Sequence, residues 1–238
     1  MADAKVTARV MTPPFRMSYP TLITPKQFVR NGKPQGDPKF SVNMIFNMDQ
    51  DEKFRHFPES GDPVLVSIKK LGQELAAKKW PGKKMGELFP PKQSNGIPKG
   101  WLIINGDKKA AEMEAKGKDA EAYKGKFVIA ATSTESVPPE LRYLDGKKQI
   151  TLDRTNEKDM AKAKELFVGG YYCATAVLNL MAHTVDDNNF ITAYVNNLLF
   201  WKKGEKIGKG SLMDRFEGIE GGEADFDPTA GLDDEFMS

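Results

Sequence analysis

The sequence predicts a mainly β fold that carries helical and loop insertions. Three observations support this prediction: apolar and polar residues alternate over several segments, two long alternating segments follow each other within residues 169–201, and few segments show helical spacing. Alternation with a period of two places successive side chains on opposite faces of a strand. Several strands with few helices are typical of antiparallel sheets and small barrels.

Residues 169–201 predict a long β-hairpin around which the other elements are arranged. In its first strand we expect one inward face, formed by Tyr172, Ala174, Ala176, Leu178, Leu180 and Ala182. In its second strand the inward face is Ile191, Ala193, Val195, Leu199 and Trp201. Residues 184–189 (TVDDNN) have the composition of a hairpin turn. The opposite face, which includes Tyr171 and Tyr194, is either a hydrated surface or a platform for flat ligands such as bases.

The first half of the chain predicts strands at residues 5–10, 15–23 and 39–48. In the last of these, the inward residues are Phe40, Val42, Met44, Phe46 and Met48. Asn31-Gly32, within residues 28–38, is a strong hairpin signal. Asp62 as N-cap and Pro63 at the first helical position predict a helix, which the sequence Trp80-Pro81-Gly82 ends.

The second half predicts a long loop at residues 82–100, strands at 101–105 and 127–133, and a loop at 135–146. Residues 107–123 are expected to form a short exposed helix or a mobile insertion, broken near Gly117. A short apolar piece at 150–152 precedes a helix at 155–167, whose apolar stripe is Met160, Ala163, Leu166 and Phe167. We expect order to end near Gly210. This order of elements best fits a five-stranded barrel of the oligonucleotide-binding type, whose last two strands come from the long hairpin.

Charge is distributed unevenly along the 238 residues. The net charge is +2, but residues 217–238 hold eight acidic residues and no basic ones, so residues 1–216 carry +10 (35 basic residues against 33 − 8 = 25 acidic ones). We therefore expect a folded domain at residues 1–212 and a flexible acidic tail at 213–238. A basic body with an acidic tail indicates a polyanionic partner.

The single cysteine, Cys173, excludes an internal disulfide and fits a reducing compartment. We expect it to be a buried structural thiol. The first residues, MADAKVTARV, lack the apolar core of a signal peptide, and no apolar run approaches the roughly 18 residues that span a bilayer. These features predict a cytoplasmic protein that does not bind a membrane.

Few residues suit catalysis. His56 and His183 lie far apart in the sequence and neither belongs to a cluster with metal-ligand spacing, so we expect neither a metal nor another cofactor. Asp186-Asp187 most simply shapes the hairpin turn, although paired carboxylates could hold Mg²⁺ in a nuclease. The prediction is a non-enzyme. A metal-dependent nuclease acting on DNA and a non-catalytic virion or assembly protein stay as alternatives.

Aromatic residues recur beside cationic ones, a combination that single-strand-binding proteins use to stack bases and hold phosphates. A core aromatic beside a lysine with its charge in solvent gives the same pattern, and Trp201 in particular is expected in the core by its parity. The residues we predict to contact DNA are Arg16, Tyr19, Lys39, Lys99, Trp101, Arg142, Tyr143, Lys147, Tyr171 and Tyr194.

The acidic tail ends in Asp233, Asp234, Glu235 and Phe236. A solubilising end explains most such tails. An aromatic residue on a mobile acidic string can also enter a partner's pocket while the acids meet a basic rim. The same string can occupy the basic groove of the body when nucleic acid is absent. We predict that this tail masks the groove and recruits a partner.

Residues 127–210 resemble a family of bacteriophage single-stranded DNA-binding proteins. The segments FVIAATS, ELFVGGYYCATAVLNLMAH and ITAYVNNLLFWKKGEKIGKG carry this resemblance. The resemblance implies an oligonucleotide-binding barrel that coats single-stranded DNA in phage replication and recombination, within the infected host cell. It also implies a tail that contacts replication proteins such as DNA polymerase or helicase. The turn departs from the family pattern because it has no glycine. Oligomeric state stays open, with a homodimer as one alternative.

Overall fold

The computed structural model describes residues 6–30, 33–59 and 61–207. The strands of this part are β1 (Val6–Met11), β2 (Phe15–Arg30), β3 (Lys33–Asn47), β4 (Phe54–Phe57), β5 (Val64–Val66), β6 (Ile103–Asn105), β7 (Lys126–Thr134), β8 (Glu140–Asp145), β9 (Lys148–Thr151), β10 (Tyr172–Val185) and β11 (Asn188–Lys202). The helices are α1 (Ile68–Lys79), α2 (Met85–Leu88), α3 (Gly106–Ala115) and α4 (Glu157–Leu166), with 3₁₀ turns η1 (Met48–Lys53) and η2 (Glu121–Tyr123).

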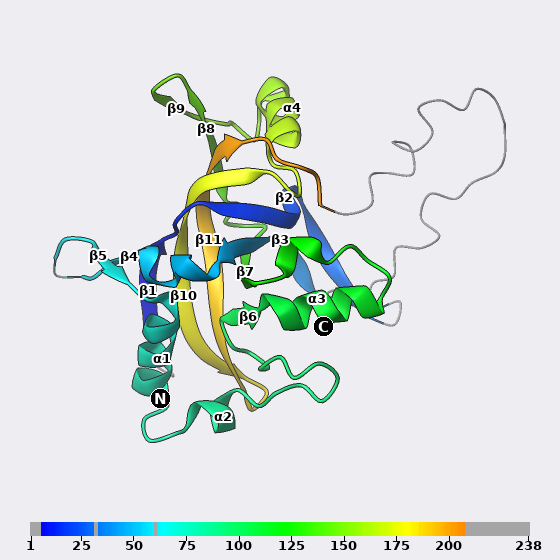
Figure 1. The fold of residues 1–238 in the computed structure, drawn as a ribbon. Coiled ribbons are helices and arrows are strands. Elements are labelled where there is room, and N and C mark those ends of the chain that lie inside the picture. Colours follow the sequence, from blue (N-terminus) through cyan, green and yellow to red (C-terminus); the bar gives the residue numbers. More distant parts are fainter. Residues whose placement is uncertain (1–5, 31–32, 60, 208–238) are drawn as a thin grey trace.

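Five strands pair in a closed ring, in the order β2, β3, β7, β11, β10 and back to β2 (Figure 1). The pair β7–β11 is parallel and the other pairs of the ring are antiparallel. The ring closes where Tyr172 and Cys173 of β10 pair with Arg16 and Phe15 of β2. Strands β1, β4 and β5 extend the sheet beyond β10, and β8 and β9 extend it beyond β11. The chain is therefore mainly β, as predicted, in one mixed sheet.

Alternating apolar residues fill the inside of the ring. Phe40, Val42, Met44 and Phe46 of β3 are buried as predicted, whereas Met48 lies in η1 and is exposed. Phe46 packs against the rings of Phe15, Phe54 and Phe127 at centroid distances of 5.1–5.6 Å. Helix α1 adds Ile68, Leu71 and Leu75 to this core, and α4 adds Ala163 and Leu166. The predicted apolar stripe of α4 is thus confirmed.

The distal half of the β10–β11 hairpin follows the predicted alternation. Ala176, Leu178, Leu180 and Ala182 are buried on β10, and Ile191, Ala193 and Val195 are buried on β11. At its tip Val185 pairs with Asn188, so Asp186 and Asp187 form a two-residue turn. Both have positive φ, 46° and 61°, which a tight hairpin turn of the mirror-image type requires. The turn is therefore tight without glycine.

The open end of this hairpin departs from strict alternation. In the cross-strand register, Tyr172 faces Lys202, Cys173 faces Phe200 and Thr175 faces Leu199, which leaves Trp201 and Ala174 without partners. Asn196 is likewise left over between the pairs of Val195 and Asn197. Each extra residue is a β-bulge, which moves the following side chains to the other face. As a result, Leu198 rather than Leu199 is buried, and the core position predicted for Trp201 is wrong because its side chain is 49% exposed.

Helix α1 begins later than the sequence predicts. Helix α1 starts at Ile68, because the side chain of Ser67 accepts a hydrogen bond from the Lys70 amide and is the N-cap. The start predicted at Asp62 and Pro63 is wrong, since Val64–Val66 forms β5 against β4. The helix ends before Trp80, as predicted.

The loop predicted at residues 135–146 contains strand β8, which pairs with β9 and runs parallel to β11. The guanidinium of Arg154 donates to the carbonyls of Leu22, Ile23 and Pro139 at 2.8–3.4 Å and lies 4.6 Å from the centre of the Phe40 ring. These contacts join the residue before β8 to β2. No helix of the described residues is long and apolar enough to cross a bilayer.

Candidate nucleic-acid interface

A row of directly paired residues runs across the outside of the sheet, from β4 through β1, β10, β11, β7 and β3 to β2. Directly paired residues project from the same face. In order, they are Phe57, Arg9, Asn179, Tyr194, Thr132, Ser41 and Thr21. Each is exposed or half-buried, whereas their neighbours Ala193, Ala131 and Val42 are buried on the inside. We call this row, together with Lys26 and Lys39, the outer strand face.

Hydroxyl, amide and aromatic groups dominate the outer strand face. The hydroxyls of Thr21 and Ser41 lie 2.8 Å apart in a hydrogen bond, and Asn179 donates to the Asn196 side chain at 3.3 Å. Tyr194 lies between Thr132 and Asn179 with its ring half-buried. Such a surface offers hydrogen-bonding groups and two aromatic rings, those of Tyr194 and Phe57, to a flat polar ligand.

Cations lie at both ends of this face. Lys26 and Lys39 are directly opposite each other on β2 and β3, and both are exposed. Like charges in this arrangement destabilise strand pairing, so an anion between them would be stabilising. At the other end, the guanidinium of Arg9 lies 6.0 Å from the centre of the Phe57 ring. Because these cations lie at opposite ends of the outer strand face, they favour an extended anionic ligand over a compact one.

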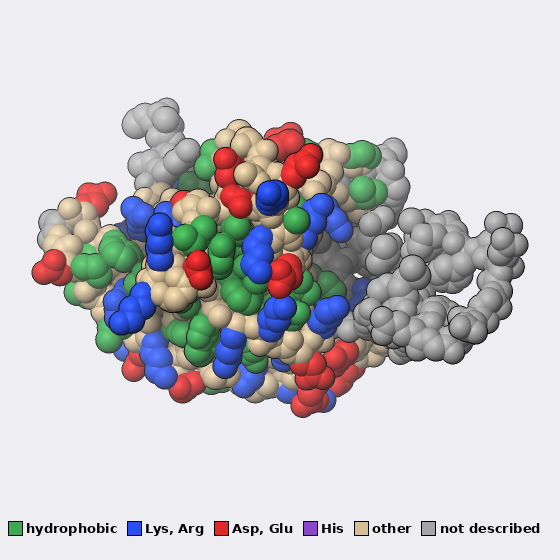
Figure 2. Space-filling view, turned by 90° about the horizontal axis from the view of Figure 1, so that it is seen from above, with side chains coloured by type: hydrophobic (Ala, Val, Ile, Leu, Met, Phe, Trp, Pro, Cys, Tyr) green, Lys and Arg blue, Asp and Glu red, His purple; other side chains and the backbone are tan. Residues whose placement is uncertain are grey.

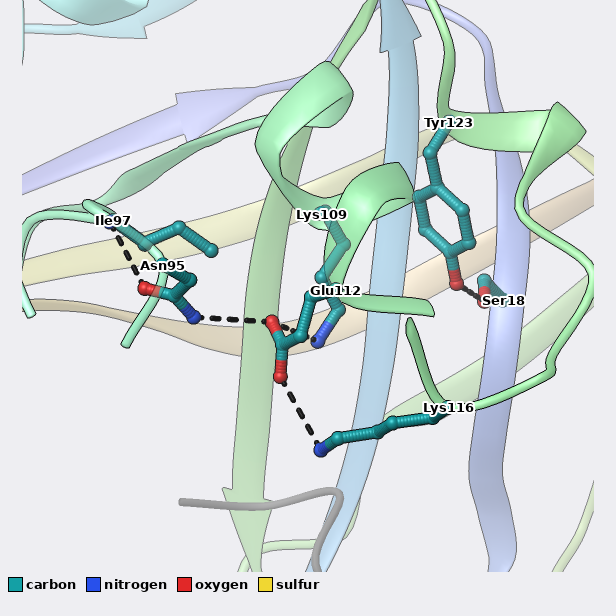
Figure 3. Close-up of polar contacts among 7 residues, drawn as sticks. All are labelled: Ser18, Asn95, Ile97, Lys109, Glu112, Lys116 and Tyr123. Carbon is teal, nitrogen blue, oxygen red and sulfur yellow. Dashed lines mark hydrogen bonds and ion pairs between the residues drawn. The ribbon is translucent and has the colours of Figure 1, made fainter. Parts of the chain in front are cut away.

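The insertion between β6 and β7 covers part of the outside of the ring. Ala110 and Met113 of α3 and Tyr123 of η2 bury Ile45 and Val128, which point outward from β3 and β7. The Tyr123 hydroxyl hydrogen-bonds the buried Ser18 hydroxyl at 2.5 Å (Figure 3), and burial raises the pKa of Tyr123 to about 12. The insertion forms a small core of its own with these two strands. The prediction of an exposed helix at residues 107–123 therefore holds only for the side of α3 that faces away from the sheet.

A half-buried carboxylate attaches this insertion to the loop before it. Glu112 of α3 accepts a hydrogen bond from Asn95 and pairs with Lys109 and Lys116, all at 3.3–3.4 Å (Figure 3). Burial acts to raise the pKa of Glu112, but the two lysines outweigh it and hold the pKa below its usual value. Burial lowers the pKa of Lys109. These contacts fix helix α3 against the loop that contains Asn95.

The predicted DNA contacts occupy several different places. Tyr194 and Lys39 lie on the outer strand face. Tyr19 is 38% exposed with φ 44°, and burial together with Asp119 raises its pKa. Lys99 donates to the Asn188 side chain at 2.6 Å, beside the tip of the β10–β11 hairpin. Arg16 lies at the opposite end of the ring and donates to the carbonyls of Gly170 and Glu205.

The other predicted residues lie away from the outer strand face. Trp101 packs against Phe89, with ring centroids 5.2 Å apart. Arg142 pairs with Glu140 at 2.7 Å, Tyr143 packs against the main core, and Lys147 is exposed in the turn between β8 and β9. Tyr171 packs against Phe200. Asp233, Asp234, Glu235 and Phe236 lie outside the described residues.

Sequence reasoning missed Arg9, Lys26 and Trp201. Arg9 could have been found from parity, since it lies on the outward side of the strand predicted at residues 5–10. Lys26 could not, because the predicted strand ends at residue 23 whereas β2 continues to Arg30. Trp201 could not have been found in this way, because parity placed it in the core and the sequence carries no simple signal for a β-bulge.

Nothing in the described part of the chain forms a metal centre, since no three His, Cys, Asp or Glu side chains lie together there. Asp186 and Asp187 form the tight turn, as the simpler prediction had it. Cys173 is fully buried, and its burial raises its pKa far above the usual thiol value. The predicted structural thiol is confirmed.

The family model of the single-stranded DNA-binding protein of Enterobacter phage Enc34 matches residues 8–227. The chain belongs to this family. Membership agrees with the prediction of a phage single-stranded DNA-binding family and of a protein without catalytic activity. A search of curated proteins found no match.

Solved structures of the Enc34 protein share this fold. Its complex with single-stranded DNA matches with 20% identity and a TM-score of 0.52, over 83% of this chain and 88% of that one. A C-terminally truncated form matches with 20% identity and a TM-score of 0.52, over 84% and 88%. A third structure of the Enc34 single-stranded DNA-binding protein matches with 19% identity and a TM-score of 0.50, over 88% of this chain and 90% of that one.

Proposed function

We propose that this protein binds single-stranded DNA without sequence preference and without catalysis. The family match over residues 8–227 carries the proposal, because the family's name-giving member is a single-stranded DNA-binding protein. The outer strand face supports it: aromatic rings and hydrogen-bonding groups suit bases and sugars, and the flanking cations suit phosphates.

We further propose that the five-strand ring is an oligonucleotide-binding barrel. Its pairing order supports this assignment, because the parallel pair joins β7 and β11, which are the third and fifth of the five ring strands in chain order. Barrels of this type bind oligonucleotides across their second and third strands, here β3 and β7, between two hairpin loops. Lys39, Ser41 and Thr132 lie on the outside of those two strands.

A titration with labelled oligonucleotides tests the function. We expect tight binding of single strands, weaker binding of duplexes, and no cleavage with Mg²⁺. The logarithm of the binding constant should fall linearly with the logarithm of salt concentration, because bound cations release counterions. Cleavage in Mg²⁺ would favour the nuclease alternative, and equal binding of both DNA forms would favour an assembly protein.

A paired substitution tests the place of binding. Removing both lysines by Lys26→Ala and Lys39→Ala should reduce the salt slope by about 1.4, since each phosphate contact contributes about 0.7 for single strands. Lys69→Ala with Lys78→Ala removes the same charge from exposed positions of α1 and is the matched control. Equal slopes for the two double variants would contradict binding at the outer strand face.

The acidic tail is proposed to compete with DNA and to contact replication proteins such as a DNA polymerase or helicase of the infected cell. Eight acidic residues against a +10 body support the competition. Deleting residues 217–238 should tighten DNA binding at low salt and change it little at high salt, where charges are screened. Unchanged or weaker binding at low salt would contradict masking. The domain boundary at residue 212, the replication or recombination role and a homodimer stay predictions.

A further inference from the structure

A cleft lies at the other end of the ring from the hairpin tip, where β10 begins and β11 ends. The cleft has a volume of about 380 Å³ and is lined by Arg16 of β2, Asn47 of β3, Lys126 of β7, Tyr172 of β10 and Trp201 of β11, among others. Figure 2 looks onto the end of the molecule that carries α4 and the end of β11. On this face lysine and arginine side chains are interspersed with hydrophobic ones.

A β-bulge places the Trp201 ring at this cleft. Tyr172 pairs with Lys202 and Cys173 with Phe200, so Trp201 is the extra residue and its side chain turns outward. Trp201 is 49% exposed and lacks much of the apolar burial that a tryptophan in the core would gain, so core packing does not explain its position. Bulges often re-aim side chains next to functional sites.

Cations surround the two aromatic rings. The Lys202 ammonium lies 4.4 Å from the Trp201 ring centre and 5.3 Å from that of Tyr172. The Arg16 guanidinium lies 5.9 Å from the Tyr172 ring centre. Lys126 donates to the Asn47 side chain at 2.6 Å, which leaves further ammonium protons to bind an anion. Glu121 also lines the cleft, and its carboxylate is paired with Lys124 at 3.1 Å.

Backbone contacts hold this arrangement in place. Arg16 donates to the Gly170 carbonyl at 3.0 Å and to the Glu205 carbonyl at 2.6 Å. Gly170 has φ +98° and lies so close to Glu205 that a Cβ there would overlap its carbonyl. The segment after β11 is thereby fixed across the start of β10, and Arg16 is oriented before any ligand binds.

The cleft and the outer strand face share one side of β3. Lys39 and Ser41 point outward at one end of that strand, and Asn47 does so at the other, with Ile45 under the α3 insertion between them. At about 3.4 Å per residue, Lys39 and Asn47 are roughly 27 Å apart. One extended DNA strand can therefore reach both places by passing the insertion.

We propose that the cleft is a second contact point for the bound strand, which takes one nucleotide with its base stacked on Trp201 and its phosphate held by Lys126 and Lys202. This inference rests on the proposed function. It adds a site at the opposite end of the ring from Lys39. Of the residues at this site, only Arg16 was among the DNA contacts predicted from the sequence. The stacking ring accepts any base, which agrees with binding that lacks sequence preference.

Tryptophan emission of the full chain tests the proposal. Adding an oligothymidylate of about 15 nucleotides, within the usual site sizes of such folds, should quench the emission by stacking on Trp201. Trp201→Ala should remove most of this quenching, because Trp80 and Trp101 are half-buried and pack against Phe89. It should also weaken binding by about 5- to 150-fold, the usual loss of one stacked base.

Two further variants sharpen the result. Trp201→Phe keeps an aromatic ring and should recover part of the affinity. Leu144→Ala removes an exposed hydrophobic side chain of β8 and should leave affinity unchanged. Thermal unfolding of each variant shows whether Trp201→Ala keeps the fold, as its exposure predicts.

Several outcomes would overturn the proposal. Unchanged quenching and affinity in Trp201→Ala, while Lys26→Ala with Lys39→Ala weakens binding, would show that DNA uses the outer strand face alone. A Trp201 signal that responds to deletion of residues 217–238 but not to DNA would assign the cleft to the tail. If the unmodified chain did not bind single strands at all, the proposed function itself would fail.

Discussion

The distal half of the β10–β11 hairpin and its open end are continuous in sequence but pair differently. In the distal half, residues 178–182 pair with 191–195 in unbroken register, and each buried residue is two positions from the next. At the open end, bulges at Ala174, Asn196 and Trp201 interrupt the register. The regular half therefore builds the core, while the irregular half turns an aromatic side chain towards a cleft. This contrast separates positions that hold the fold from positions free to contact a ligand.

The largest effect on stability is expected in the regular half. Leu180 is fully buried against the core, so Leu180→Ala should lower the free energy of unfolding by about 2–5 kcal/mol. Urea denaturation measures this loss. Asn179→Ala, the exposed neighbour on the outer strand face, should change stability by less than about 0.5 kcal/mol. Equal losses for the two variants would contradict the assignment of faces.

A smaller loss is expected at the open end, where Cys173 is buried although strict alternation points it outward. Cys173→Ser places a hydroxyl in an apolar site and should lower the free energy of unfolding by about 1–3 kcal/mol. Because burial raises the thiol pKa, the folded chain keeps its proton where the unfolded chain loses it. Stability should thus decline as pH rises above the ordinary thiol pKa, about 8.5.

That pH dependence provides the check. Cys173→Ala should lose the part of the decline that comes from the thiol, and a thiol reagent at pH 8 should react with the native chain only as fast as it opens. Rapid labelling of the folded protein would refute the buried position. It would also weaken the argument that bulges at the open end reverse the faces.

The sequence predicts the regular half of the hairpin well and its irregular open end poorly, and the same holds for the rest of the sheet. Alternation correctly located β1, β3, β7 and the distal hairpin, because one buried face imposes a period of two. It failed for Trp201 since an unpaired residue changes parity without a local signal. It also failed for β8, whose strand form depends on pairing with β9 and with distant β11. Ser67 was overlooked as the N-cap because Asp62-Pro63 is a stronger local signal, which pairing of Val64–Val66 with β4 overrides.

The candidate site was predicted less well than the fold, for a related reason. Basic residues beside aromatics in sequence need not share a face: Trp101 and Tyr143 pack against the core, while Arg9 and Phe57, distant in sequence, come together across β1 and β4. A DNA surface is assembled from cross-strand neighbours. Those neighbours become known only once the register is known.

The smallest effect is expected at the hairpin tip, where Asp186 and Asp187 both have positive φ. An L-residue with a Cβ is strained in this region by roughly 1–2 kcal/mol, although Asp tolerates it better than most residues. Asp187→Ala should therefore lower the free energy of unfolding by about 1 kcal/mol, whereas Asp187→Gly should not lower it. Neither variant should alter single-strand affinity, because turn geometry rather than a carboxylate is required. Equal destabilisation by Ala and Gly would instead show that the Asp187 carboxylate makes a stabilising contact. Backbone geometry would then not be the main requirement at the tip.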